Sequence, residues 1–336
     1  MVDDINATEC GLLTTYPVIP EGLTAADYVL ARFRLDLLEQ VFLDAGTLFR
    51  LRGALRRAGR EVLGGRADAW FDPPLSSDPA ALKRFQKAAP AFVLRPELVR
   101  DGEWYEGDQL ELEVLFLGTG ITSLGDFCRT MQALGKSGLA AGKGRFDLTG
   151  VTCLGSDGNW RELRGGGGKA LPAPELLSLG EWLDGLPPIA KPILEFLTPA
   201  RLMTGGRVLR QPQFAQLFPF LLRRVTSMLY YHCGLEPVDD PAPLLSAVAQ
   251  IEARWLEVRW HEGLESGAEV ANGRIGGLTG RLLLDGPGLR ELLWVVALAT
   301  LFGVGKGSAW GSGRCRLAEA IPVDILYSSD FKEVLL

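Results

Sequence analysis

The chain has 336 residues, of which 47% are apolar, and carries a formal net charge of −6. This composition excludes a disordered chain and supports one large or two ordinary domains. The five cysteines are scattered without a C-x-x-C pair, which argues against a zinc site or a disulfide framework and favours a reducing compartment. The N-terminus carries acids where a signal peptide carries bases, and the longest apolar run, Leu292–Leu301, is too short to span a bilayer. We therefore expect a cytoplasmic protein with no membrane partner.

The first half of the chain alternates strand-like and helix-like patterns. Strands are predicted at Tyr28–Leu37, Ala91–Leu94 and Gly107–Leu117, and helices at Gly46–Leu63 and Ser123–Leu134. A glycine-rich basic loop, residues 135–148, then leads into another strand. In the first helix the apolar side chains share one face and the arginines fan over the opposite face, as the helical period requires. The apolar face holds Leu48, Leu51, Leu55, Ala58 and Val62.

The second half repeats this scheme. A helix is predicted at Phe214–Tyr231, with Pro219 expected to break it or delay its start. Further elements follow it: strands at Ile251–Trp260 and Gly276–Leu284, a helix at Leu289–Leu301, a glycine loop at Gly303–Gly313 and a strand from Cys315. Each half therefore ends in a helix, a glycine-rich basic loop and a strand, which suggests an internal duplication.

This order of elements favours an α+β fold of two tandem ferredoxin-like (RRM-like) β-α-β-β-α-β domains with mostly antiparallel sheets. We expect an N-terminal ferredoxin-like domain at 1–154 and a C-terminal ferredoxin-like domain with the glycine-rich loop at 193–336. The stretch between them, 155–192, contains four consecutive glycines and several prolines and is expected to be a linker or insertion.

Charge is segregated along the sequence. Residues 48–60, 127–146, 201–224 and 303–314 contain arginines or lysines but no acid, whereas acids gather at 101–113 and 236–240. One such basic window is typical of a solvated helix face. Four of them indicate a local positive field in spite of the negative total, which suits a polyanionic partner.

The stretch Gly303–Arg314 is the most informative of these windows. Five of its twelve residues are glycine, and its only charges are Lys306 and Arg314. Glycine permits positive φ and a close approach of two backbones, and a tight turn between helix and strand would need the same residues. The stretch is not a phosphate loop of an NTPase, because it follows a helix, Thr300 replaces the leading glycine and glycine follows the lysine. A dinucleotide-binding turn between strand and helix is also missing.

Only two histidines are present, His232 and His261. No Ser/His/Asp or Cys/His spacing stands out, and the histidines and cysteines form no recognisable metal site. We therefore expect no metal and no cofactor. His232 follows two tyrosines at the end of a predicted helix, where a histidine is commonly a cap.

Three stretches resemble the CRISPR-associated endoribonucleases that cut precursor CRISPR RNA, the sixth Cas protein family of the RAMP superfamily. The most specific is Gly276–Gly286 followed by a helix and Phe302–Leu317, which looks like the C-terminal signature of the family. Phe196–Leu202, leading to Leu221–Leu229, is similar to the first strand and helix of the family's C-terminal domain. Phe49–Ala58, with residues 107–108 and 135–148, is similar to the N-terminal domain of the longer members.

The resemblance implies RNA held across a basic cleft between two ferredoxin-like domains. It implies a metal-independent cleavage in which the ribose 2′-hydroxyl attacks the adjacent phosphate and leaves a 2′,3′-cyclic phosphate and a 5′-hydroxyl. The partners would be CRISPR repeat RNA or crRNA, and other Cas proteins of an effector complex. Trp310 would stack on a base, and cations would bind phosphates. The RNA-binding residues expected are Arg52, Arg56, Arg60, Lys143, Arg145, Gly303, Gly305, Lys306, Gly307, Trp310, Gly311, Gly313 and Arg314.

The sequence departs from the family at one point. Many members place a catalytic histidine in or just after the first helix, and this chain has no histidine before position 232. Three alternatives stay open: an arginine or tyrosine near that helix acts by orientation and charge, His232 serves from the other domain, or the protein binds without cutting. Tyr231 and His232 are the acid–base pair expected from the sequence. Two other classes of function are a non-catalytic RAMP subunit that binds guide RNA in an interference complex and a binder of small nucleotides.

Overall fold

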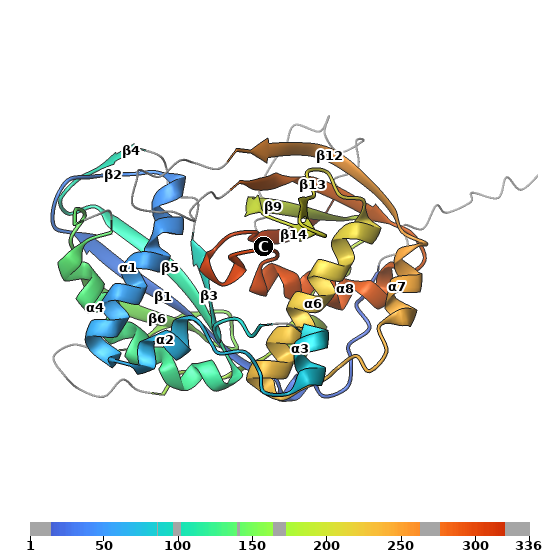
Figure 1. Ribbon diagram of the computed structural model, residues 1–336, viewed down its shortest axis with the longest axis horizontal. Helices are drawn as coiled ribbons and strands as arrows, with labels where there is room; N and C mark the ends of the chain where they lie inside the picture. Colours follow the sequence, from blue (N-terminus) through green and yellow to red (C-terminus); the bar gives the residue numbers. More distant parts are fainter. Residues whose placement is uncertain are drawn as a thin grey trace, which may run out of the picture.

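The computed structural model describes residues 15–85, 87–96, 102–139, 142–163, 173–262 and 276–319. Two domains lie side by side, each with a sheet and two long helices (Figure 1). No helix within these ranges is both long and apolar enough to cross a membrane.

The N-terminal domain is a β-α-β-β-α-β unit with additional short elements. Its main elements are β1 (Asp27–Leu37), α1 (Ala45–Leu63), β3 (Phe92–Pro96), β5 (Gln109–Leu117), α4 (Leu124–Ser137) and β6 (Phe146–Leu154). The four strands lie in the order β3-β5-β1-β6, and each neighbouring pair is antiparallel. Helices α1 and α4 pack against each other on one side of the sheet (Figure 1).

The C-terminal domain repeats this topology. Its main elements are β9 (Pro192–Ala200), α6 (Phe214–Cys233), β12 (Glu252–His261), β13 (Gly277–Asp285), α8 (Leu289–Phe302) and β14 (Cys315–Glu319). The strand order β12-β13-β9-β14 is equivalent to that of the first domain, and again every pair is antiparallel. The expected pair of tandem ferredoxin-like domains is therefore confirmed.

Short elements complete the described chain. They are η1 (Leu23–Ala25), β2 (Val41–Leu43), α2 (Arg66–Phe71), α3 (Pro79–Phe85), β4 (Gly102–Trp104), η2 (Gly118–Ser123), β7 (Trp160–Glu162), β8 (Leu177–Ser178), α5 (Leu179–Asp184), β10 (Met203–Thr204), β11 (Arg207–Val208), α7 (Ala242–Val248) and η3 (Ser308–Trp310). The stretch expected to be a linker or insertion supplies three of them: β7 pairs with β6, β8 pairs with β1, and α5 contacts α8.

The first helix forms where the apolar spacing predicts it. Asp44 caps its start: the Asp44 carboxylate accepts a hydrogen bond from the Thr47 backbone N–H, and the Thr47 hydroxyl oxygen accepts one from the Asp44 backbone N–H. Leu51, Leu55 and Ala58 are buried on the face turned to the sheet. This arrangement leaves the arginine-bearing face of α1 to solvent.

One sequence expectation on α6 is wrong. Pro219 neither breaks the helix nor delays its start, because α6 runs without interruption from Phe214 and includes the proline. A proline at this position forfeits one hydrogen bond in the second turn. The neighbouring Leu217, Phe218 and Leu221 are fully buried, and we infer that their burial offsets that loss.

The two domains share apolar packing. One face of β5 belongs to the core of its own domain, through Val114 and Phe116. The other face, through Leu115 and Leu117, packs in the cluster that also contains α6 and α8 of the second domain. The domains are therefore joined through a continuous core and not only through surface contacts.

Candidate nucleic-acid interface

The glycine-rich loop, residues 303–314, connects α8 to β14, and each of its five glycines has a positive φ between 64° and 87°. Glycine is required not only by the backbone conformation but also by the lack of space for a Cβ atom. A Cβ atom at Gly313 would lie 1.9 Å from the Val304 carbonyl oxygen, and one at Gly305 would lie 2.6 Å from the Arg201 carbonyl oxygen. The expected need for positive φ and close backbone approach is therefore confirmed.

Most backbone N–H groups of the loop already have partners in the protein. The Lys306 N–H donates to the Arg201 carbonyl at 3.0 Å, and the Gly313 N–H donates to the Pro199 carbonyl at 3.0 Å. The Arg314 N–H donates to the Thr198 hydroxyl at 2.8 Å. The loop is thus a fixed turn docked on β9, and the Lys306 side chain, which is exposed, is its clearest contact group for an anion.

Trp310 enters the core of the other domain. Its side chain is 6% exposed, stacks on the Phe71 ring with centroids 5.7 Å apart and planes inclined by 28°, and lies perpendicular to the Phe92 ring with centroids 5.4 Å apart. The Arg52 guanidinium lies over the indole, 5.5 Å from the ring centroid. This placement does not fit the expectation that Trp310 stacks on an RNA base, because the side chain is buried against protein groups.

Arg314 also joins the domains, and its guanidinium donates a hydrogen bond to the Pro96 carbonyl. Arg95, the neighbouring residue on β3, donates to the carbonyls of Thr300 (2.9 Å) and Leu301 (3.2 Å) at the end of α8. The last carbonyls of a helix carry partial negative charge and favour a cation there. Burial lowers the pKa of Arg95 to about 10, so it remains charged at neutral pH. Arg314 therefore contributes to docking and is not a free phosphate ligand in this state.

A second arginine caps the same helix from within its own domain. Arg224 of α6 donates to the Phe302 carbonyl from both Nε (3.2 Å) and an Nη atom (3.0 Å). Burial lowers its pKa to about 10. The end of α8, where the glycine loop begins, is thus held by one arginine from each domain.

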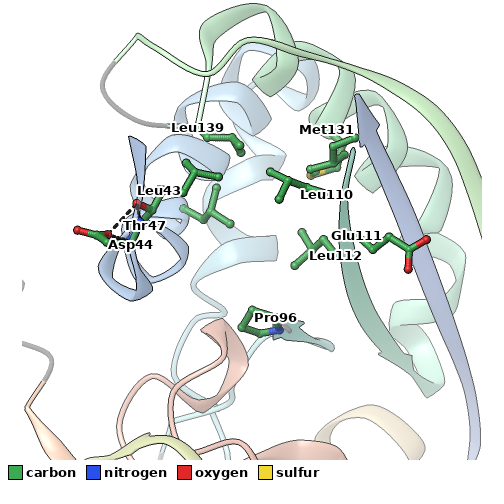
Figure 2. Close-up of a pocket in the computed structure, with 11 residues that line it drawn as sticks. Leu43, Asp44, Thr47, Pro96, Leu110, Glu111, Leu112, Met131 and Leu139 are labelled. Atoms are coloured by element: carbon green, nitrogen blue, oxygen red, sulfur yellow. Dashed lines mark hydrogen bonds between the residues drawn. The ribbon is translucent and has the colours of Figure 1, made fainter. Parts of the chain in front are cut away.

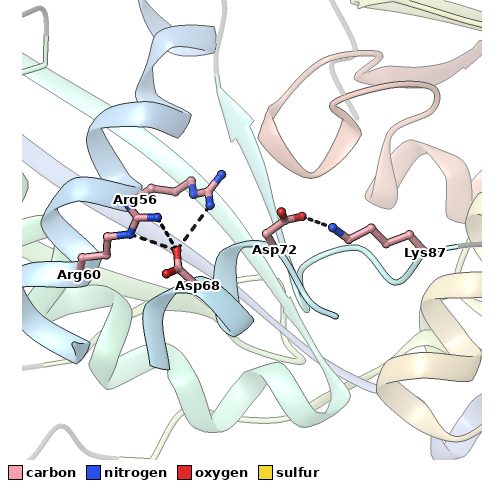
Figure 3. Close-up of polar contacts among 5 residues, drawn as sticks. All are labelled: Arg56, Arg60, Asp68, Asp72 and Lys87. Atoms are coloured by element: carbon pink, nitrogen blue, oxygen red, sulfur yellow. Dashed lines mark hydrogen bonds and ion pairs between the residues drawn. The ribbon is translucent and has the colours of Figure 1, made fainter. Parts of the chain in front are cut away.

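Arg56 and Arg60 of α1, together with Lys87, bind two carboxylates beside this junction (Figure 3). Arg60 donates to Asp68 at 2.8 and 3.0 Å, Arg56 reaches the same carboxylate at 3.4 Å, and Lys87 donates to Asp72 at 2.6 Å. We call Arg52, Arg56, Arg60 and Lys87 the α1 cation cluster. Its four positive charges face two carboxylates.

The cluster also lowers the pKa of the two carboxylates that it binds. The hydrogen bonds from Arg60 lower the pKa of Asp68, and the hydrogen bond from Lys87 lowers that of Asp72. The charges of Arg52 and Arg56 lower the pKa of Asp72 further. Both carboxylates are therefore ionised at neutral pH and occupy positions that phosphate oxygens of RNA could take in their place.

The equivalent loop of the N-terminal domain lies elsewhere. Lys143 and Arg145 are exposed beside β2, next to the start of α1. Arg145 is bound to Glu39, with Nε–Oε2 and backbone N–Oε1 distances of 3.0 and 3.1 Å. The structure therefore brings Arg52, Arg56 and Arg60 together but keeps Lys143 and Arg145 at the other end of the helix.

His232 is buried at the end of α6, 8% exposed. Its Nε2 lies 2.9 Å from the Ala89 carbonyl oxygen, and because a carbonyl only accepts, Nε2 carries the proton. Burial lowers the pKa of His232 to about 4. A Cβ atom at Gly118 would lie 2.0 Å from the His232 carbonyl oxygen, so the surrounding backbone is close as well. These surroundings favour a role in joining the two domains over one in proton transfer.

Tyr231, its neighbour, packs against α3. Its ring meets the edges of Phe85 and Tyr230, and burial raises the pKa of its hydroxyl. The predicted acid–base pair thus lies where α6 meets the segment between α2 and β3, and its catalytic role stays a prediction.

An apolar pocket lies at the start of α1 (Figure 2). Apart from Asp44 and Thr47, which bond to each other, and Glu111, its lining is apolar. The lining comprises Leu35, Leu43, Asp44, Thr47, Leu51, Pro96, Leu110, Glu111, Leu112, Met131 and Leu139. Across the described ranges no three histidine, cysteine or acidic side chains gather into a metal-binding group.

Sequence reasoning missed Lys87, Asp68, Asp72 and Arg95. None stands in a repeated motif, and Lys87 is an isolated lysine in a loop-rich stretch. Their importance comes from contacts between different elements of the fold, which for Arg95 and Thr300 are 205 residues apart in the sequence.

Two parts of the chain match models of known protein families. Residues 194–315 match the model of a family described as CRISPR-associated endoribonuclease Cas6, and residues 68–175 match a second model described as an N-terminal domain. No curated protein sequence matches the chain.

Several solved structures share the fold. Thermus thermophilus Cas6 aligns with a TM-score of 0.52 at 18% identity, and a Cas6 product complex aligns with a TM-score of 0.54 at 19% identity. Both alignments cover 87% of this chain and 99% of the other. A partial Cas6-RT-Cas1–Cas2 complex aligns with a TM-score of 0.58 at 15% identity, over 88% of this chain and 46% of the other. The second domain thus matches the model of the CRISPR-associated endoribonuclease Cas6 family, and the fold of both domains is the one that solved Cas6 structures share.

Proposed function

We propose that the protein is a metal-independent endoribonuclease that binds CRISPR repeat RNA and cleaves precursor crRNA, leaving a 2′,3′-cyclic phosphate and a 5′-hydroxyl. The observation that supports this most is the match of residues 194–315 to an endoribonuclease family, in a chain whose α1 cation cluster lies against the glycine loop of that same matched region. A cation cluster of this kind suits the phosphate backbone of RNA.

Binding would begin at the α1 cation cluster and at Lys306. An RNA helix is recognised mainly through its shape, phosphates and 2′-hydroxyls, and its phosphates suit arginines spaced along a helix face. Phosphates would take over the hydrogen bonds that Asp68 and Asp72 now accept. Lys143 and Arg145 would form a second, weaker contact, because Glu39 neutralises Arg145.

Cleavage by the 2′-hydroxyl needs three things: removal of the proton of the 2′-hydroxyl, stabilisation of the extra negative charge on phosphorus, and a proton for the leaving 5′-oxygen. An arginine can meet the second need and can orient the phosphate for in-line attack, but it stays protonated and cannot serve as the base. We propose that charge and orientation from the α1 cluster carry most of the rate enhancement, while water accepts the proton of the 2′-hydroxyl and supplies the proton that the leaving 5′-oxygen takes up. This is the first of the three alternatives that the sequence leaves open.

The predicted pair Tyr231 and His232 is tested by substitutions that preserve shape. His232→Gln keeps an amide donor for the Ala89 carbonyl, and Tyr231→Phe keeps the ring. If charge and orientation dominate, both folded variants cleave within about threefold of the wild-type rate. A loss of about a hundredfold or more in either folded variant would restore the acid–base role.

The test of the reaction itself uses a labelled repeat RNA in EDTA. We expect a product ending in a cyclic phosphate, and no cleavage of a matched RNA with a single 2′-deoxynucleotide at the cut position. Cleavage that requires Mg²⁺, or cleavage of the deoxy substrate, would contradict the proposed mechanism.

A second function is favoured by one observation: one of the two histidines is buried, and the other, His261 on β12, is hydrogen bonded to Thr279 at 2.7 Å. Such a protein could hold guide RNA without cutting it and act with other Cas proteins; a similar fold occurs in a solved Cas6-RT-Cas1–Cas2 complex. Tight, salt-sensitive binding of the repeat without any product in EDTA would support this alternative.

A further inference from the structure

We infer that Trp310 is a positioning residue: carried by the glycine loop of one domain, its indole holds Arg52 of the other domain in place for an RNA phosphate. The inference rests on the proposed RNA-binding function and adds a coupling between RNA affinity and the docking of the two domains.

The burial of Trp310 in the first domain is the first observation that supports the positioning role. The residue belongs to the second domain in sequence, yet it and Ala309 pack in the core cluster of the first domain. Its ring neighbours, Phe71 on α2 and Phe92 on β3, both belong to that first domain. The indole is therefore fixed relative to α1, not merely to its own loop.

The loop is shaped to present this side chain. Trp310 ends the short 3₁₀ turn Ser308–Trp310, and the glycines on either side, Gly307 and Gly311, both have left-handed backbone conformations. A Cβ atom at Gly311 would lie 2.7 Å from Pro96 of β3. Only a loop with glycine at these points can turn sharply enough, and approach β3 closely enough, to insert the indole.

Arg52 is the member of the α1 cation cluster that contacts the Trp310 indole. Arg56 and Arg60 bind Asp68, and Lys87 binds Asp72, whereas Arg52 has no ion-pair partner among the described residues. Its guanidinium lies over the Trp310 ring, and tryptophan is the most favourable ring for such a contact. Arg52 is thus exposed for a ligand while its position is limited by the indole.

Such a contact would affect RNA binding through preorganisation. A long arginine side chain loses rotamer freedom when it binds a phosphate, and a ring that already restricts it removes part of that cost. Removal of the ring should therefore weaken binding through Arg52 and should have no further effect once Arg52 is gone.

The experiment is a double-mutant cycle on the full chain. Binding of a cleavage-resistant repeat RNA, with a 2′-deoxynucleotide at the cut position, is measured for wild type, Trp310→Leu, Arg52→Ala and the double variant. We expect Kd to rise about fivefold for Trp310→Leu and about tenfold for Arg52→Ala, with the double variant no weaker than Arg52→Ala alone. Trp310→Phe, which keeps a ring, should recover most of the affinity.

The control is Arg57→Ala, because Arg57 is an exposed α1 arginine with no ring contact to Trp310. Its combination with Trp310→Leu should be multiplicative in Kd. Thermal unfolding and near-ultraviolet circular dichroism establish that each variant is folded. A Trp310→Leu protein that is folded and binds as wild type does, or a multiplicative Arg52 double variant, would overturn the inference.

The outcome separates the two proposals. Wild-type cleavage in EDTA together with independent effects of Arg52 and Trp310 would sink the positioning role alone. Coupled effects without cleavage would sink the nuclease and leave the positioning role. A wild-type protein that does not bind repeat RNA would overturn both.

Discussion

The two glycine-rich loops occupy the same place in the two domains, between the second helix and the last strand, yet their surroundings differ. Residues 303–314 are docked on the other domain through Trp310, Arg314 and Gly311. In the described part of the first-domain loop, Lys143 and Arg145 face solvent, and Arg145 pairs with Glu39. A duplicated topology therefore preserves the path of the backbone, while the neighbouring domain decides what each loop does.

The two loops should differ most in how much stability is lost when a single glycine is replaced. Gly313→Ala would place a methyl group 1.9 Å from the Val304 carbonyl oxygen at a φ of +64°, whereas Gly142→Ala has a φ of +89° but open space around it. We expect the free energy of unfolding to fall by about 3–5 kcal/mol for Gly313→Ala and by about 1–2 kcal/mol for Gly142→Ala. Urea denaturation measures both, and equal losses would show that the two loops are equally constrained.

Replacement of the arginine beside each loop should also cost more stability at the C-terminal loop than at the N-terminal loop. Arg95→Ala removes the donor to the Thr300 and Leu301 carbonyls and leaves buried Glu113 with one cation fewer, so we expect a loss of about 2–4 kcal/mol. Arg145→Ala breaks an exposed pair and should change stability little. Thermal unfolding of the two variants is the measurement. A stable Arg95→Ala protein would show that the clamp on α8 does not hold the domains.

His232 adds a pH dependence to the domain junction. Its folded pKa of about 4 is below the unfolded value, so between pH 6.5 and 4 the unfolded chain binds a proton that the folded chain does not. Stability from this group is complete above about pH 6.5 and falls by up to about 3 kcal/mol as the pH decreases to 4. In His232→Gln this part of the curve should flatten. An unchanged slope between wild type and variant would mean that His232 is not the titrating group.

The smallest expected effects are changes in RNA affinity when either of the two exposed loop lysines is replaced. Lys306→Ala should raise the Kd for repeat RNA about fivefold and reduce the salt slope by about 0.7–0.9, because one phosphate contact is lost. Lys143→Ala should raise the Kd by less than about twofold, since Glu39 weakens the positive field there. Fluorescence anisotropy over a salt series gives both quantities. A larger effect at Lys143 would reverse the assignment of the two loops.

Much of the fold could be predicted from the sequence. Long periodic elements such as α1, β5 and α8 were predicted within a few residues, because their apolar spacing is set by burial on one face or both. Short pieces such as β7 and α5 were missed within a stretch interpreted as a linker. Strand β7 has only three residues, and the two-residue strand β8 that leads into α5 pairs with β1, far from it in the sequence. The predicted break at Pro219 was wrong for a similar reason, because tertiary packing of the neighbouring residues keeps the helix intact.

The site was only partly predictable. Arginine spacing on α1 identified a basic face, and the glycine pattern identified a tight loop. The sequence could not show that Trp310 inserts into the other domain, that Arg314 binds Pro96 or that Asp68 pairs with Arg60. The first two contacts depend on how the two domains dock, and the third depends on how α2 packs against α1.

The location of RNA on the protein is the most direct test of the account. Lysine acetylation rates, read by mass spectrometry with and without uncleavable repeat RNA, compare the two surfaces in one experiment. We expect strong protection of Lys87 and Lys306 and little protection of Lys136 and Lys143. Protection of Lys143 without protection of Lys87 or Lys306 would contradict it.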